Sequence, residues 1–240
     1  MSRPRALLLD LDDTILSYTA HGAPAWQRVC EKYAPDLDLE PGALRKIIDA
    51  AAREHWSDEE RHRLGRLNLL HARCEILTTA LTAADRDAGP WAAAMALDYH
   101  DWREDAVAPF PGALEALDKL RDLGLALALL TNGASEGQRK KIDRYELAPR
   151  FQAILVEEEF GVGKPHASVY LEALSRLGVA ASDVWMVGDS LTADIKGAQS
   201  VGIHAVWNDY ANRGLPEHLG VTPDRTITHI SEVAEFLSQA

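Results

Sequence analysis

The sequence predicts an α/β fold, in which a Rossmann-like, doubly wound parallel sheet forms the core and carries an inserted α-helical cap. Short apolar runs that end in polar clusters alternate with helical patterns along much of the 240-residue chain, and this alternation is typical of doubly wound sheets. One long segment, residues 17–105, interrupts the alternation with helical patterns alone. The proportions of 47% hydrophobic and 26% charged residues are those of an ordinary globular chain.

The apolar runs are the candidate strands of the sheet. They are Ala6–Leu9, Leu125–Leu130, Phe151–Val156, Val184–Val187 and Ile203–Trp207. Continuous apolar runs of this length fit parallel strands that helices cover on both faces. Between them, Pro111–Gly124 and Ala167–Gly178 have the apolar spacing of helices and end in glycine, a common helix stop.

The segment 17–105 is expected to form a separate helical domain. Its helical patterns cover Ala25–Tyr33, Pro41–His55, Arg66–Thr82 and Trp91–Arg103. Crossover connections between parallel strands normally take far fewer residues. We therefore expect a core domain of residues 1–16 and 106–240 and a cap of residues 17–105. Two ordinary crossover helices with long loops remain the alternative.

The charge balance and the apolar content limit the partners of the protein. Lys and Arg number 25 against 37 Asp and Glu, a formal net charge of -12. No basic block offsets this acidity, so we expect neither nucleic-acid nor membrane-surface binding. No apolar run approaches the ~20 residues of a membrane span. The two cysteines, Cys30 and Cys74, form no CxxC pair and are expected to be reduced thiols. A cytoplasmic protein, monomeric or homodimeric, is the expectation.

Polar clusters follow four of the candidate strands, and ligands of open α/β sheets bind at the carboxyl ends of strands. The clusters are Asp10–Thr14, Thr131–Gly133, Gly163–Pro165 and Gly188–Asp194. Carboxylates that gather in one crevice repel each other unless a cation joins them. Because the clusters contain oxygen donors but no Cys or His, they favour Mg²⁺ over zinc.

The same four stretches resemble, in order, the four motifs of the haloacid dehalogenase-like (HAD) hydrolase superfamily. Asp10–Thr14 matches its DxDxT signature, and Gly188–Asp194 matches its GDxxxxD form. The resemblance covers the whole chain, and residues 17–105 resemble the C1-type cap of that superfamily. Thr131–Gly133 with Gln138, and Trp207 at the end of the last candidate strand, are similar to the N-acylneuraminate-9-phosphatase and pyrimidine 5′-nucleotidase branches.

This resemblance implies a magnesium-dependent phosphomonoester hydrolase that acts on a small phosphorylated metabolite. Asp10 would be the nucleophile, which forms an aspartyl-phosphate, and Asp12 the general acid and base. On a regular strand these two residues would face the same side, and crowding by other carboxylates would help Asp12 to keep its proton. The remaining implied roles are metal binding by Asp10, the backbone carbonyl of Asp12, and Asp189; phosphate binding by Thr131, Asn132 and Lys164; and support of the metal site by Asp194 and Ser190.

Other activities remain open on this fold. A sugar phosphomutase resembles the phosphatases in keeping the second aspartate, whereas haloacid dehalogenases lack it, so Asp12 favours a phosphomonoesterase. A non-catalytic binding protein is the alternative from another class. In the cap, Arg66 and His62 are the candidates for contact with the leaving group, since Gly65 would free the backbone beside Arg66 and a guanidinium can hold an anion. A solvated helix face is the alternative for both.

Overall fold

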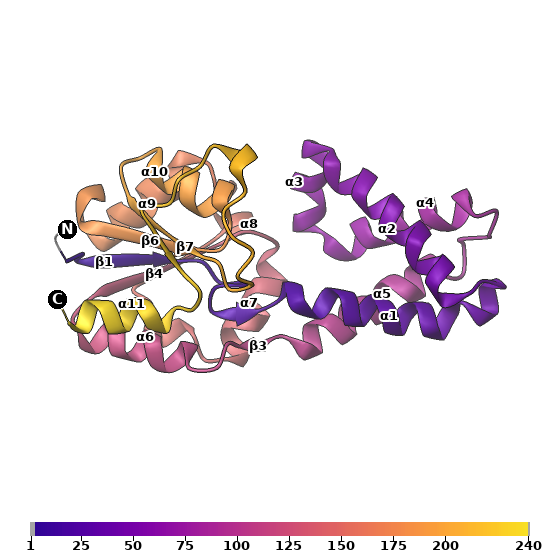
Figure 1. Cartoon of the computed structure of the whole chain (residues 1–240), viewed down its shortest axis with the longest axis horizontal. Helices are drawn as coiled ribbons and strands as arrows, with labels where there is room; N and C mark the ends of the chain where they lie inside the picture. The colour runs from indigo at the N-terminus through magenta and orange to yellow at the C-terminus, as the bar shows by residue number, and fades with distance from the viewer. Residues whose placement is uncertain (1–2, 240) are drawn as a thin grey trace. The chain divides into compact units, whose positions relative to one another are not determined.

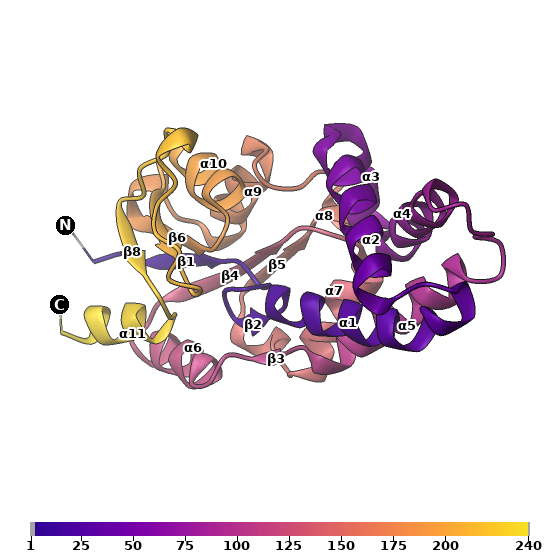
Figure 2. The ribbon, with the colours of Figure 1, turned by 45° about the vertical axis from the view of Figure 1, so that its right-hand side comes forward.

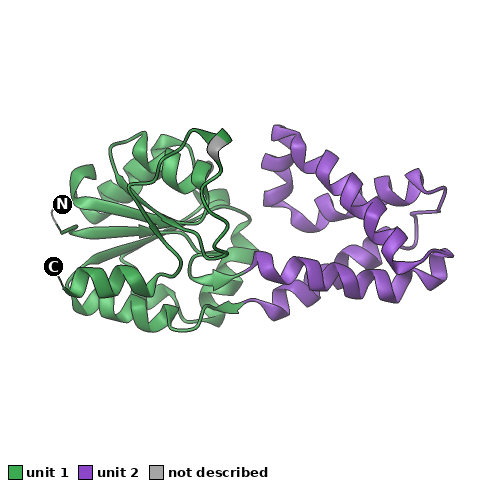
Figure 3. Cartoon of the chain, viewed as in Figure 1, with its two compact units in different colours: residues 1–17, 108–240 green, residues 18–107 purple. Residues whose placement is uncertain are grey.

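The computed structural model describes residues 3–239, and the chain divides into two compact units (Figure 3). The core unit comprises the chain up to Ser17 and from Ala108 onward, and the helical unit comprises Tyr18–Val107. From the sequence, the cap was expected to comprise residues 17–105. The two boundaries of the helical unit lie one and two residues later in the chain.

The core unit contains a parallel sheet of six strands in the order β5-β4-β1-β6-β7-β8 (Figures 1 and 2). The strands are β1 (Ala6–Leu9), β4 (Ala126–Thr131), β5 (Ala153–Val156), β6 (Val184–Gly188), β7 (His204–Asn208) and β8 (Arg225–Ile227). In the register, Leu8 pairs with Ala128 of β4 and with Met186 of β6. The predicted fold class is confirmed. The sixth strand, β8, was missed because its three residues include the polar Arg225 and Thr226.

Helices cover both faces of this sheet. Figures 1 and 2 show α6 (Ala113–Asp122) and α11 (Ser231–Ser238) on one face, and α9 (Ala167–Leu177) and α10 (Gly197–Gln199) on the other. Ala6 and Leu8 pack in one buried cluster with Tyr170 of α9. Every residue of β1 is fully buried, as the continuous apolar run predicts.

Shorter elements of the core unit lie near the ends of the strands. They are the antiparallel pair β2 (Leu16–Ser17) and β3 (Ala108–Pro109), the helices α7 (Ser135–Arg144) and α8 (Glu157–Phe160), and a π-helical turn, Leu191–Lys196. The last three follow β4, β5 and β6 directly, so they start at the carboxyl edge of the sheet.

The helical unit consists of α1 (Gly22–Tyr33), α2 (Pro41–Ser57), α3 (Glu59–Leu67), α4 (Leu69–Ala83) and α5 (Ala92–Ala106). Residues 18–107, all of which the structure describes, contain no strand. The unit has its own apolar core, with Val29, Leu44, Ile48, Leu77 and Met95 among its buried members. This separate core explains why the segment forms a compact unit.

Two expectations about this unit are wrong. The single helix expected over Arg66–Thr82 is divided at Asn68, whose side chain accepts a hydrogen bond from the His71 backbone N–H at 3.1 Å and thereby caps α4. Gly65 is a buried helical residue and not a point of backbone freedom. A Cβ at Gly65 would lie 2.8 Å from the ring of Trp56, so the glycine permits close packing.

Among residues 3–239, no helix is long and apolar enough to cross a membrane. Cys30 and Cys74 are both free cysteines.

Candidate active site

Asp10 lies directly after the central strand β1. Its backbone N–H donates to the carbonyl of Val187 at 3.0 Å, which continues the pairing of β1 with β6 by one residue. The residue is 7% exposed. Its Oδ1 atom lies 2.6 Å from Nζ of Lys164, and its Oδ2 atom accepts a hydrogen bond from the Thr14 hydroxyl at 3.4 Å. Asp10 is therefore a buried carboxylate at the end of the sheet, held by a cation.

Lys164 joins two carboxylates. Its Nζ atom also lies 2.6 Å from Oδ1 of Asp194. Burial lowers the pKa of Lys164, but the attraction of Asp10 and Asp194 outweighs this effect and holds the pKa above its ordinary value. The backbone of Lys164 is held by the Asn132 side chain, which donates to its carbonyl and accepts from its N–H, both at 2.8 Å. Lys164 is thus a fixed cation at the centre of the site.

The carboxylates of Asp10, Asp189 and Asp194 form a cluster, with one oxygen from each within 4.8 Å of the others. The backbone N–H of Ser190 donates to Asp194 Oδ2 at 2.9 Å, and the indole of Trp207 donates to the Asp189 carbonyl at 2.8 Å. A Cβ at Gly188 would collide with the Asp194 carboxylate. Strand β6 therefore ends in glycine because the acidic cluster lies against its backbone.

Burial dominates the electrostatics of this cluster. It raises the pKa of Asp10 to about 7, although the attraction of Lys164 opposes the shift. Burial also raises the pKa of Asp189 to about 9, and repulsion from Asp10 and Asp194 adds to the effect. A cation between these carboxylates would favour their ionised forms. Three hard oxygen donors without a thiol or an imidazole fit Mg²⁺. Asp194, expected to support the metal ligands from outside, belongs to the same cluster.

Asp12 lies in different surroundings from those expected. Strand β1 ends at Leu9 and the chain then turns, with φ at 60° in Asp13, so the strand argument for a shared side does not apply. The ion-pair partner of Asp12 is Lys141, whose Nζ atom lies 2.8 and 2.9 Å from the two carboxylate oxygens. From the sequence, only other carboxylates were expected around Asp12. This cation was not included, because Lys141 lies outside the four sequence motifs.

Gln138 connects Asp12 to the residues that follow β4. Its Nε2 atom donates to Asp12 Oδ2 and to the Asn132 carbonyl, both at 3.1 Å, and also to the Thr131 hydroxyl. In the sequence, Gln138 was identified only through the resemblance to two phosphatase branches, and Lys141 was not identified. The sequence did contain a signal for both residues. Gln138 and Lys141 are three residues apart on α7, the helix that follows Thr131–Gly133, and residues with this spacing share a helix face.

The structure thus brings together Asp10, Asp12, Thr131, Asn132, Lys164, Asp189, Ser190 and Asp194 in the core unit. His62 and Arg66 both lie on α3 of the helical unit, with Arg66 Nη1 3.4 Å from His62 Nδ1. Their expected contact with a leaving group stays a prediction.

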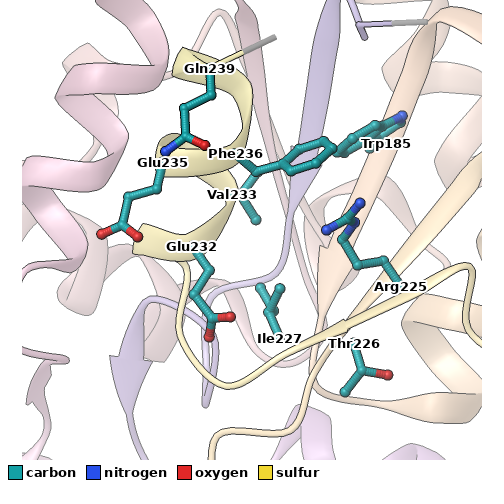
Figure 4. A pocket seen from close by; sticks show the side chains of 9 residues that line it. All are labelled: Trp185, Arg225, Thr226, Ile227, Glu232, Val233, Glu235, Phe236 and Gln239. Atoms are coloured by element: carbon teal, nitrogen blue, oxygen red, sulfur yellow. The ribbon is translucent and has the colours of Figure 1, made fainter. Parts of the chain in front are cut away.

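A cavity of about 270 Å³ lies elsewhere in the core unit (Figure 4). Its lining includes Trp185 of β6, Arg225 and Phe236. The centroid of the Phe236 ring lies 3.8 Å from the guanidinium carbon of Arg225. None of the expected site residues lines it.

A doubly wound sheet that gathers buried carboxylates and a fixed lysine at its strand ends defines an enzyme site of the haloacid dehalogenase type. The family model described as haloacid dehalogenase-like hydrolase matches residues 4–202, and the chain belongs to this family.

Known relatives include phosphatases. The phosphoserine phosphatase of Thermus thermophilus is 34% identical over 260 residues, which cover 98% of this chain and 99% of that protein. The pyrimidine 5′-nucleotidase YjjG of Escherichia coli is 32% identical over 130 residues, which cover 54% of this chain and 56% of that protein. The structure of the putative HAD-hydrolase YfnB from Bacillus subtilis bound to magnesium shares the fold, with a TM-score of 0.71, 24% identity, and coverage of 98% of this chain and 99% of that chain. The protein is therefore a hydrolase with phosphatases among its relatives.

Proposed function

We propose that the protein is a magnesium-dependent phosphomonoester hydrolase that acts on a small phosphorylated metabolite through an aspartyl-phosphate on Asp10. The observation that carries the proposal is the position of Asp10. It lies in the cluster with Asp189 and Asp194, 2.6 Å from Lys164, and Asp12 follows two residues later. Phosphoryl transfer depends mainly on positioning and on stabilisation of charge, and this arrangement supplies both.

In the proposed reaction, a carboxylate oxygen of Asp10 attacks phosphorus, and the ester oxygen leaves with a proton from Asp12. Asp12 then takes a proton from the water that attacks phosphorus and releases phosphate from Asp10. Lys164 holds the Asp10 carboxylate at 2.6 Å and offers its charge to the phosphate oxygens. Thr131 and the Asn132 backbone would hold the other phosphate oxygens.

Charge balance supports the involvement of a divalent cation. Asp10, Asp12, Asp189 and Asp194 are accompanied by two lysines, Lys141 and Lys164, so two formal negative charges remain when all these groups are ionised. Asp10, Asp189 and the backbone carbonyl of Asp12 would hold Mg²⁺, and Asp194 would keep Lys164 in place. When bound, Mg²⁺ supplies charge neutralisation for the phosphate in a site that would otherwise repel it.

Asp12 favours a phosphatase over a dehalogenase, because a leaving alkoxide needs a proton whereas a leaving halide does not. The words phosphatase and nucleotidase in the names of the two sequence relatives support the same choice. Their named substrates differ. We propose that the helical unit acts as a cap that selects the leaving group, and that the protein works on a soluble metabolite in the cytoplasm.

The test is hydrolysis of p-nitrophenyl phosphate and of a panel of phosphate monoesters, each assayed with Mg²⁺ and with EDTA. We expect turnover with Mg²⁺, its loss in EDTA, and its return when Mg²⁺ is restored. The panel should include phosphoserine and the pyrimidine nucleoside 5′-monophosphates. Full activity in EDTA would contradict the role of the metal, and hydrolysis of a haloacid without hydrolysis of any phosphate ester would contradict the reaction class.

A further inference from the structure

The Asp12 carboxylate is held on both of its oxygens by residues outside the four sequence motifs. Lys141 Nζ lies 2.9 Å from Oδ1 and 2.8 Å from Oδ2, and Gln138 Nε2 donates to Oδ2 at 3.1 Å. The Asp12 side chain is 24% exposed, whereas that of Lys141 is 7% exposed. Both oxygens of the more exposed residue are thus in contact with partners from the protein interior.

Gln138 orients Lys141 as well as Asp12. The Gln138 Oε1 atom accepts a hydrogen bond from Lys141 Nζ at 2.9 Å, while its Nε2 atom contacts the Thr131 hydroxyl and the Asn132 carbonyl. One amide thus links the ammonium to the end of β4. Hydrogen bonds at both ends of the amide leave it a single orientation.

Helix α7, which carries both residues, is fixed at its amino-terminal end. Glu158 Oε2 accepts from the Ser135 backbone N–H at 2.6 Å. Glu159 accepts from the Ser135 hydroxyl at 2.6 Å and from two nitrogens of Arg139 at 2.8 and 2.6 Å. Bidentate pairs of this kind restrict geometry more than a single contact does. The three glutamates that follow β5 therefore include two that anchor the helix on which Gln138 and Lys141 lie.

We propose that Lys141, oriented by Gln138, is a positioning residue that fixes the Asp12 carboxyl for proton transfer to the leaving oxygen, a role that rests on the proposed phosphatase function. In that step the bond from Asp10 oxygen to phosphorus forms and the bond from phosphorus to the ester oxygen breaks. The electron pair stays on the ester oxygen, which takes the proton that Asp12 carries in the substrate complex, and Asp12 is left as the carboxylate with which Lys141 forms its ion pair. A carboxyl free to rotate is less often within reach of that oxygen, and misplacement by about 1 Å can cost on the order of a hundredfold in rate.

The role predicts a dependence on the leaving group. Phenyl phosphate and 2,4-dinitrophenyl phosphate have leaving groups of related shape, but phenolate is strongly basic and needs a proton, whereas dinitrophenolate leaves without one. General acid catalysis contributes ~10²–10⁴-fold, and loss of positioning removes part of it. For Lys141→Met, we expect kcat/KM to fall about 10- to 100-fold on phenyl phosphate and less than about threefold on dinitrophenyl phosphate.

Matched variants separate this role from general damage. Lys140→Met changes an exposed lysine of the same helix and should leave both substrates unaffected. Lys141→Arg, which keeps the charge, should restore part of the activity on phenyl phosphate. In an Asp12→Asn background, Lys141→Met should cost nothing further, because residues that act through each other are not additive. Should Lys141→Met lose its circular dichroism signal, Gln138→Leu is the second variant, and it should show the same difference between substrates.

Equal losses on the two esters, or no loss on either, would overturn the positioning role while the phosphatase function stands. If the wild-type protein with Mg²⁺ hydrolyses neither ester nor any member of the monoester panel, the proposed function fails, and the positioning role fails with it. Additive losses in the Asp12→Asn background would also overturn it.

Discussion

The Lys164 ammonium lies 2.6 Å from the Asp10 carboxylate, and the side chains are 2% and 10% exposed. The same ammonium lies 2.6 Å from Asp194, so one cation contacts two buried carboxylates, and the carboxyl group of Asp189 lies beside them. This arrangement is stable only while the positive charge is present, because removal of one partner of a buried ion pair leaves an uncompensated charge. We therefore expect Lys164 to stabilise the fold as well as to take part in the proposed chemistry.

Replacement of Lys164 by methionine tests this dual need. We expect no measurable turnover, and a loss of about 3–5 kcal/mol in the free energy of unfolding of the metal-free protein. Because Mg²⁺ would replace some of the missing charge, it should recover part of that loss. Urea unfolding with EDTA and with Mg²⁺ measures both effects. Lys196→Met, at an exposed position of the π-helical turn, is the control. Unchanged stability in Lys164→Met would show that the carboxylates do not depend on the cation.

The raised pKa values of Asp10 and Asp189 predict how pH affects the metal-free protein. Folding raises them from 3.8 to about 7 and about 9, with burial as the main cause. The unfolded chain ionises these carboxyls first, so their contribution to stability is complete below about pH 4 and is lost as the pH rises through about 7 and then about 9.

Because Mg²⁺ needs the ionised carboxylates, it should raise Tm more at pH 9 than at pH 6 and release protons on binding. Thermal unfolding across this pH range, with Mg²⁺ or EDTA, checks the prediction. Asp189→Asn should abolish most of the Mg²⁺ effect, whereas Asp183→Asn, at a partly exposed position, should not. A shift in Tm that is the same at every pH would contradict the assignment.

Asp10 should carry the phosphoryl group during turnover. Asp10→Asn is expected to lower kcat by on the order of 10⁶, as loss of a covalent nucleophile does elsewhere, without unfolding the protein. Rapid acid quench of the wild-type enzyme with substrate, followed by borohydride reduction, should convert Asp10 to homoserine in the peptide that contains it. Reduction at no residue, with turnover intact, would indicate direct attack by water.

Gly188 tests the close approach of β6 to Asp194. A Cβ at Gly188 would collide with the carboxylate of Asp194, so Gly188→Ala should destabilise the protein by about 1–3 kcal/mol and weaken Mg²⁺ binding. Gly137→Ala on α7 is the control, since a Cβ at Gly137 meets nothing within 4 Å. Equal stability of the two variants, measured by urea unfolding, would show that Asp194 can move aside at little cost.

The sequence allowed prediction of the motifs that follow strands but not of the contacts made by helix faces. Asp10, Lys164 and Asp189 were predictable because each follows an apolar run, and the carboxyl ends of parallel strands meet at one edge. Lys141 lies on a helix that is held by contacts with Glu158 and Glu159, which are more than a dozen residues away in the chain. No local pattern reveals such contacts.

The same limit explains the other differences in structure. Strand β8 has three residues, too few for a pattern of its own, and it forms because β7 offers a free edge, with Val206 opposite Arg225. The division between α3 and α4 depends on the cap supplied by Asn68. Apolar spacing continues across that residue, so periodicity alone predicts one helix where the structure has two.

Arg66, which lies in the helical unit, is expected to recognise the leaving group. Arg66 lies in the last turn of α3, with its Nη1 atom 3.4 Å from His62 Nδ1. A lost charge-assisted hydrogen bond costs about 1.5–3 kcal/mol, so Arg66→Ala should lower kcat/KM for the best natural substrate by roughly tenfold to over a hundredfold. The effect should fall mainly on KM and should be far smaller for p-nitrophenyl phosphate, whose leaving group offers little to hold.

Arg53→Ala, at an exposed position of α2, is the control. Equal losses on both substrates would show that Arg66 supports the fold, and no loss on either would identify it as part of a solvated helix face.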